Sequence, residues 1–264
     1  MINIDQYAYI SKLKQTSPMK KLLFALLTIG VCLWADSIII SLLVLIIMGW
    51  ITVHKGGTPL VLFLKLLLVP MSFLIIGVLT IGINVSNNPA VFLFSVHVLG
   101  THIGVSQAGI QNAARLFFKA LGAVSCLYYL SLSTPMVDLL AALRRLKVPK
   151  LLVELMGLIY RFIFVLLETA DTMFTAQNSR LGYSSLSSVY RSLAALASTL
   201  FVRACKRADE LYTALESRGY DGELNVLEEP FQTHITEFIA PVAINLFLIL
   251  TTLFLRRYSG GFLL

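Results

Sequence analysis

Long apolar runs, separated by short polar stretches, dominate the first half of the chain and recur near its end. The runs cover residues 20–35, 37–53, 59–83, 109–132 and 237–255. A helix of roughly 20 residues crosses the hydrocarbon core of a bilayer, so these lengths suit membrane spans. Asp36 marks a tight turn between the first two runs, and Pro70 is a kink that neighbouring helices can accommodate. The pattern therefore predicts a bundle of about five transmembrane helices.

Between the fourth and fifth runs, residues 133–236 are polar but keep a helical spacing of apolar positions. Thr134 and Pro135 suit the N-cap and the first position of a short amphipathic helix that reaches about Leu146. Pro149 opens a second, long helix that ends near Arg180. A third helix follows a Gly-Ser turn and ends near Arg218. Its apolar face steps by three and four through Leu193, Leu196, Leu200, Ala204, Ala208, Leu211 and Leu215.

The start of the second helix leaves an alternative open. Residues 151–167 are apolar and just long enough to cross a bilayer. However, they carry Glu154 and Arg161, which with Glu168 recur every seven residues along one stripe, and both flanks are basic. We therefore expect this helix to lie beneath the bundle. The predicted fold is an all-α membrane protein with an N-terminal membrane region (1–132), a three-helix cytoplasmic coupling region (133–236) and a C-terminal span (237–264).

Composition supports this assignment. Hydrophobic residues make up 57% of the chain, charged residues only 13%, and the mean hydropathy is +0.82. A soluble domain carries roughly a quarter charged residues, so a single water-soluble core is excluded. The net charge of +7 does not indicate nucleic-acid binding, because basic and aromatic residues are not interleaved. Cys32, Cys126 and Cys205 are far apart, so they predict neither disulfides nor zinc binding.

Basic residues orient the predicted spans, because they favour the cytoplasmic side of a membrane. Four lysines precede or open the first span, and several arginines and lysines follow Leu132, whereas residues 84–108 carry no Lys, Arg, Asp or Glu. We expect the N-terminus and residues 133–236 inside and residues 84–108 outside. The last span then runs outward and leaves Arg256 and Arg257 on the side that the rule disfavours.

The two long helices of the coupling region end alike. The first ends with Ala176, Arg180 and then Gly182, and the second with Ala214, Arg218 and Gly219. Each ending places a small residue and an arginine four apart on one helical face. The small residue allows a partner to approach closely, and the planar guanidinium of the arginine can hydrogen-bond carboxylates or carbonyls of that partner. The alternative interpretation is two ordinary helix C-caps with helpful basic residues. Two near copies on consecutive helices favour the functional interpretation.

These features together resemble a known family. The opening segment Asp5–Lys21, the stretch Leu139–Lys150, Tyr160-Arg161-Phe162 and the two Ala-x-x-x-Arg endings are similar to the transmembrane T component of energy-coupling-factor (ECF) transporters, specifically the cobalt-type Q subunits. The second ending fits the family's Ala-Arg-Gly coupling motif. The first departs from it, because Leu181 separates Arg180 from Gly182.

The resemblance implies a non-catalytic subunit of an ATP-driven importer in the cell membrane. Two separate ATPase subunits are then expected to bind one arginine tip each, and a further membrane subunit captures the substrate. ATP is bound by the ATPases, so no cofactor is expected on this chain. The implied substrate is cobalt, for corrinoid synthesis, with nickel or a vitamin as alternatives.

Two other classes of membrane protein fit the sequence less well. A membrane enzyme acting on lipid or isoprenoid substrates needs a DxxxD pair, an HExxH or a GxSxG motif, and the spans contain none. A Walker A motif is absent as well, and a stand-alone channel does not explain the charged helical segment. His97 and His102 lie five apart, which fits neither one helix face nor one side of a strand, so we expect no metal site there. The roles of Lys65, Arg115 and Lys119 in or beside the spans are open.

Overall fold

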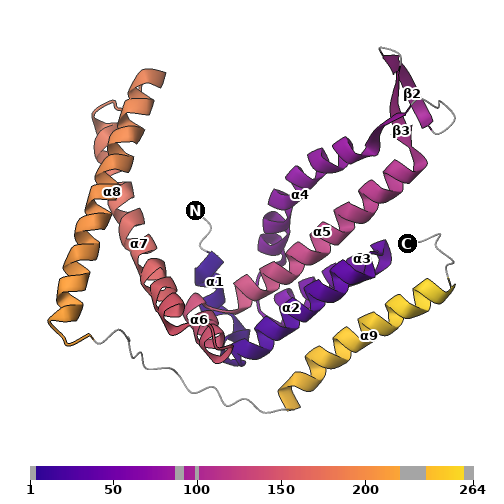
Figure 1. The fold of residues 1–264 in the computed structure, drawn as a ribbon, viewed down its shortest axis with the longest axis horizontal. Coiled ribbons are helices and arrows are strands. Elements are labelled where there is room, and N and C mark those ends of the chain that lie inside the picture. Colours follow the sequence, from indigo (N-terminus) through magenta and orange to yellow (C-terminus); the bar gives the residue numbers. More distant parts are fainter. Residues whose placement is uncertain (1–3, 87–91, 99–100, 221–235, 259–264) are drawn as a thin grey trace. The chain divides into compact units, whose positions relative to one another are not determined.

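The computed structural model describes residues 4–86, 92–98, 101–220 and 236–258 (Figure 1). The chain divides into two compact units. The membrane unit comprises Met1–Leu139 and Pro230–Leu264, and the hairpin unit comprises Leu140–Glu229.

The membrane unit is a bundle of helices, of which five among the described residues are long and apolar enough to cross a bilayer. The five candidate spans are Pro18–Ala35, Ile38–Lys55, Leu60–Gly82, Gly109–Ser133 and Phe238–Arg257. They lie within a few residues of the predicted runs, so the predicted polytopic helical fold is confirmed. The elements of the unit are α1 (Ile4–Ile10), η1 (Lys12–Gln15), α2 (Pro18–Ala35), α3 (Ile38–Trp50), η2 (Ile51–Lys55), α4 (Leu60–Gly82), α5 (Gln107–Ser133) and α9 (Thr236–Tyr258).

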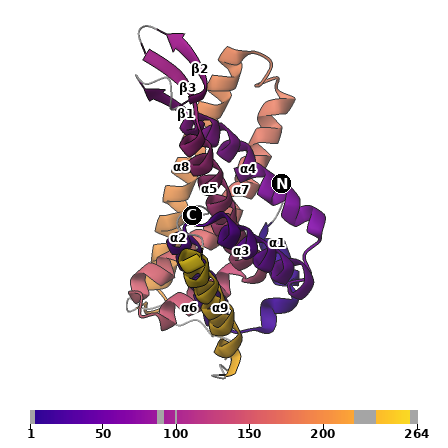
Figure 2. The same ribbon diagram turned by 90° about the vertical axis from the view of Figure 1, so that its right-hand side faces the viewer.

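Helix α5 is the centre of this bundle and packs against α2, α3 and α4, which run beside it (Figure 2). Its N-cap is Ser106, whose hydroxyl accepts a hydrogen bond of 3.0 Å from the Gly109 amide. Gly122 permits close packing, because a Cβ there would lie 3.0 Å from both Cys32 Sγ and the Ser41 carbonyl oxygen. Around this contact the core is formed by Phe24, Ala25, Cys32, Ala35, Ile40, Val44, Met48, Ile51, Cys126, Tyr129 and Leu248.

One end of α2 carries a buried lysine. Lys21 is only 1% exposed, and its Nζ donates to the carbonyl oxygens of Ser133 (2.8 Å) and Leu13 (3.1 Å). Ser133 is the last residue of α5. Lys21 therefore joins the start of α2 to the end of α5, just before the chain enters the hairpin unit.

The other end of α2 carries an ion-pair cluster. Asp36, which caps α2 in a left-handed conformation, lies 2.8 Å from Lys119 Nζ and 3.8 Å from Arg115 Nη1. Arg256, near the end of α9, donates to the Trp34 carbonyl oxygen at 3.1 Å and lies over the Trp34 ring. Arg115 and Lys119 thus have a structural partner, and Arg256, the exception to the charge rule, stabilises the C-terminus of α2.

A small antiparallel sheet was not predicted from the sequence. Strands β1 (Ile83–Ser86), β2 (Phe92–Val98) and β3 (Thr101–Ser106) pair in the order β1-β3-β2. His97 and His102 are directly paired across β2 and β3. The prediction that their spacing separates them was wrong, because it considered a single strand and not a hairpin. The absence of a metal site at these two residues stays a prediction.

The hairpin unit contains the long helices α7 (Lys150–Ser179) and α8 (Leu186–Glu216), with the end of α6 (Met136–Arg145) before them. The three helices agree with the predicted bounds to within a few residues. Ser185 caps α8, accepting a hydrogen bond from the Ser188 amide at 3.3 Å. A short turn joins α7 to α8, so the two helices run antiparallel, and they diverge away from the turn (Figure 1).

Candidate coupling interface

The first arginine ends α7 in a tightly closed turn. The Gly182 amide donates to the Gln177 carbonyl oxygen at 2.9 Å, and the Leu181 amide donates to that of Asn178 at 3.0 Å. This pair of hydrogen bonds is the Schellman motif, in which one residue adopts the left-handed conformation. Here that residue is Leu181, with a φ of 57°.

The second arginine ends α8 in the same motif. The Tyr220 amide donates to the Leu215 carbonyl oxygen at 3.0 Å, and the Gly219 amide donates to that of Glu216 at 3.0 Å. Gly219 takes the left-handed position, with a φ of 74°. In both turns the arginine is the residue directly before the left-handed one, so Arg180 and Arg218 are equivalent in structure.

This equivalence changes the role expected for Gly182. Its counterpart in the second turn is Tyr220, whereas Leu181 is the counterpart of Gly219. Gly182 is needed for space: a Cβ there would lie 2.7 Å from Ser192 Oγ and 2.8 Å from the Gln177 carbonyl oxygen. Leu181 therefore holds the place in the first turn that Gly219 holds in the second, and Gly182 leaves room for Ser192 beside the turn.

Side chains hold the first turn against the start of α8. Gln177 Nε2 donates to the Ser192 carbonyl oxygen at 3.1 Å, and Ser192 Oγ donates to the Gly182 carbonyl oxygen at 2.8 Å. Tyr183 donates from its hydroxyl to Gln177 Oε1 at 2.8 Å, and its ring contacts Phe174. This network ties the turn that follows Arg180 to the first turns of α8.

Both arginine side chains are available to a partner. Ala176, Arg180, Ala214 and Arg218 are all exposed, and neither guanidinium has an ion-pair partner among the residues that the structure describes. The tips lie at opposite ends of the hairpin, because the second is reached only after the 31 residues of α8. At a rise of 1.5 Å per residue, this helix separates the tips by about 45 Å.

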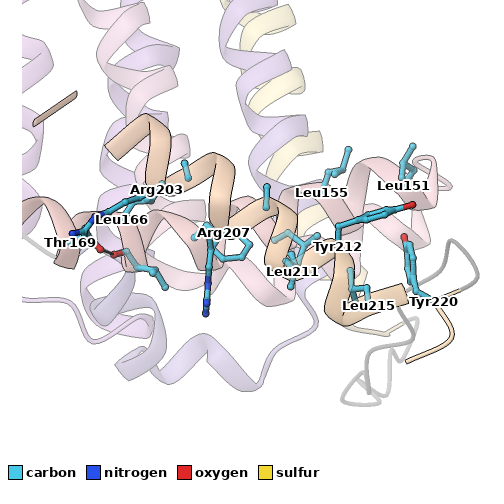
Figure 3. Close-up of a pocket in the computed structure, with 15 residues that line it drawn as sticks. Leu151, Leu155, Leu166, Thr169, Arg203, Arg207, Leu211, Tyr212, Leu215 and Tyr220 are labelled. Carbon is cyan, nitrogen blue, oxygen red and sulfur yellow. Dashed lines mark hydrogen bonds between the residues drawn. The ribbon is translucent and has the colours of Figure 1, made fainter. Parts of the chain in front are cut away.

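An apolar groove opens where α7 and α8 diverge (Figure 3). Its volume is about 740 Å³. Apolar side chains of both helices form most of its wall, including four positions of the predicted apolar face of α8, with Arg203 and Arg207 along one edge. Tyr220 closes one end, where its hydroxyl donates to Glu154 Oε2 at 3.5 Å. The sequence pattern predicted the apolar face of α8, but not that α7 and α8 diverge beside it and leave it open.

Glu154 is the buried member of the predicted charged stripe, at 7% exposure, whereas Arg161 and Glu168 are exposed. The stripe therefore does not act as one surface. Among the described residues, no group of three or more His, Cys, Asp or Glu side chains could hold a metal ion. The candidate contact surfaces among the described residues are the two exposed tips and the groove.

Comparison with known sequences identifies the family of the chain. The sequence model of the CbiQ family, described as "Cobalt transport protein", matches residues 10–228. The chain belongs to the CbiQ family. It is 31% identical over 234 residues to the cobalt transport protein CbiQ of Salmonella typhimurium, an alignment covering 86% of this chain and 100% of that protein.

Two further relatives extend the comparison beyond that protein. The chain is 34% identical over 256 residues to the uncharacterized protein MJ1089 of Methanocaldococcus jannaschii, covering 97% of this chain and 94% of that protein. It is 29% identical over 177 residues to the energy-coupling factor transporter transmembrane protein EcfT of Staphylococcus aureus, covering 60% and 63% respectively. The predicted assignment to the T components of ECF transporters is confirmed.

Membership in the CbiQ family settles two questions raised by the sequence. CbiQ and EcfT proteins are non-catalytic subunits of transporters, so the chain is not an enzyme. As a T component it is a multi-pass membrane protein, and ATPase and substrate-binding subunits are its implied partners.

Proposed function

We propose that this chain transmits the ATP-driven motion of two cytoplasmic ATPase subunits to a separate substrate-binding membrane subunit, in an importer of cobalt ions. The two arginine tips are the contacts with the ATPases, one tip for each. The observation that carries this proposal is the pair of matching turns, each presenting an exposed arginine, at opposite ends of one hairpin.

Co-purification with the ATPase subunit of the transporter tests the role of the tips. We expect wild type to retain the ATPase and the double variant Arg180→Ala, Arg218→Ala to lose it. Removing a charge that is buried in a complex costs roughly 2–5 kcal/mol of binding free energy. The matched control is Arg161→Ala, an exposed arginine in the middle of α7, which should bind like wild type. Binding by the double variant at the wild-type level would contradict the proposal.

The groove between α7 and α8 is the surface that we assign to the membrane subunit. An open apolar wall of this size is unfavourable in water, so a partner that buries it stabilises the complex. Movement of α7 and α8 by the ATPases would then move the bound subunit with them. Substitutions in the groove should therefore reduce capture of the membrane subunit without changing capture of the ATPases.

Cobalt as the substrate rests on the family description and on the printed name of the Salmonella relative. Uptake of radioactive cobalt by cells that express the complete transporter tests it. Competition by unlabelled cobalt, but not by nickel or by a vitamin, is the expected outcome. Stronger competition by nickel or by a vitamin would assign the importer to that substrate instead.

We further propose that the N-terminus and the hairpin unit are cytoplasmic and that residues 84–108 lie outside. Cys205 on α8 is exposed, whereas Cys32 and Cys126 are buried in the bundle, so one natural thiol reports the side of the hairpin. A membrane-impermeant maleimide should label inside-out vesicles and leave intact cells unlabelled, and Cys205→Ser should abolish the labelling. Labelling of Cys205 in intact cells would place the hairpin unit outside the cell and contradict the proposed topology.

A further inference from the structure

Leu181 occupies a position that is unfavourable for it in the isolated chain. A left-handed conformation brings a Cβ close to the following carbonyl oxygen, which is why glycine is usual at this place in a Schellman turn. The equivalent residue of the second tip is indeed Gly219. At the first tip the chain carries a leucine, with a φ of 57°.

Little of the Leu181 side chain is covered by the described residues of the free chain, so little burial offsets this conformation. In many such turns an apolar residue packs against the preceding helical turn. Leu181 instead is 73% exposed. Two further apolar side chains at the start of α8, Leu186 (81% exposed) and Tyr190 (75% exposed), lie four residues apart on one helix face. Three largely exposed apolar side chains thus lie within ten residues of Arg180 along the chain.

We propose that Leu181 is an apolar anchor of the first tip, buried together with Arg180 in the same ATPase subunit. This proposal rests on the proposed function of the arginines. The occupant follows from the turn itself: Leu181 directly follows Arg180 in a turn fixed by Gln177 and Ser192, so a protein that encloses the guanidinium also covers the leucine. At the second tip the equivalent residue is Gly219, which has no side chain to bury, so we expect the contact at the first tip to be the stronger.

Substituting Leu181 by glycine separates the side chain from the turn. Glycine adopts the left-handed conformation without strain, so Leu181→Gly keeps or stabilises the turn while it removes the apolar contact. Loss of a buried leucine should weaken ATPase binding about tenfold. Leu181→Met, which keeps an apolar side chain, should bind like wild type. Phe201→Ala removes an equally exposed apolar side chain from the middle of α8 and should also leave ATPase binding unchanged.

The experiment measures the affinity of the purified full chain in detergent for the purified ATPase subunit, with Arg218→Ala as background so that only the first tip binds. The thermal stability of each variant is measured alongside. Weaker binding by Leu181→Gly, with stability equal to or above that of wild type, supports the anchor. Unchanged or tighter binding by Leu181→Gly, while Arg180→Ala abolishes binding, overturns the anchor alone. If neither variant weakens binding, both the anchor and the proposed function of Arg180 are wrong.

Discussion

The membrane unit and the hairpin unit are both built from long helices, but the helices of the membrane unit bury many more of their side chains. In α2, residues as unlike as Lys21, Phe24 and Cys32 are buried. In α8, no described residue is buried, and in α7 only Val153 and Glu154 are. The membrane unit therefore completes its own core, whereas the hairpin unit keeps its apolar face open. We infer that the hairpin unit completes its packing only in a complex.

The largest effect on the free chain is expected at Lys21. Lys21→Met leaves the Ser133 carbonyl oxygen without the ammonium that now donates to it. An unpaired buried carbonyl costs about 2 kcal/mol of the free energy of unfolding. Lys206→Met, at an exposed position of α8, is the control and should change little. Thermal unfolding in detergent measures the stability of both variants. Equal stabilities would contradict the conclusion that the membrane unit is more tightly packed than the hairpin unit.

Two glycine substitutions, one in each unit, compare the packing of the units through a smaller change in the free energy of unfolding. Gly122→Ala places a methyl group 3.0 Å from Cys32 Sγ and the Ser41 carbonyl oxygen, so we expect a loss of about 1 kcal/mol. In α7 a Cβ at Gly157 meets only Leu140 Cδ1, at 3.6 Å. Gly157→Ala should therefore be neutral or stabilising, because alanine favours a helix. The same unfolding measurement applies, and destabilisation by Gly157→Ala would show that the hairpin unit is packed more tightly than the structure indicates.

The smallest effect on the free chain is expected in the groove. Leu155 is exposed and lines the groove, so Leu155→Ser should change the free energy of unfolding by less than about 0.5 kcal/mol. The same variant should capture less of the membrane subunit, because it makes one wall of the groove polar. A variant that unfolds more easily but still captures that subunit fully would identify Leu155 as a core residue.

The sequence predicts the helices well because apolar run length and helical spacing are local properties. The five candidate spans and the three helices that follow α5 are found within a few residues of their predicted bounds. The sheet was not predicted, because β1 pairs with β3 and the two strands are separated along the chain by β2. Such a non-local pairing leaves no local pattern in the sequence. Lys21 was read as a charge flanking a span, and only the tertiary structure shows it buried against α5.

At the candidate site, the sequence identifies the two arginines but not the geometry around them. The spacing of Ala176 and Arg180 predicts a shared face, yet the residue order suggested that Gly182 matched Gly219. The hydrogen bonds of the turn show that Leu181 does. The groove was also missed, because the spacing of apolar residues shows which face of a helix is apolar but not whether a neighbour covers it.

The central claim is that each tip holds one ATPase subunit. It is tested most directly by the number of ATPase subunits bound to the full chain in detergent without nucleotide, measured by light scattering after size-exclusion chromatography. The account predicts two for wild type, one for Arg180→Ala, one for Arg218→Ala and none for the double variant. A single variant that still binds two ATPase subunits, or a double variant that binds any, would contradict it.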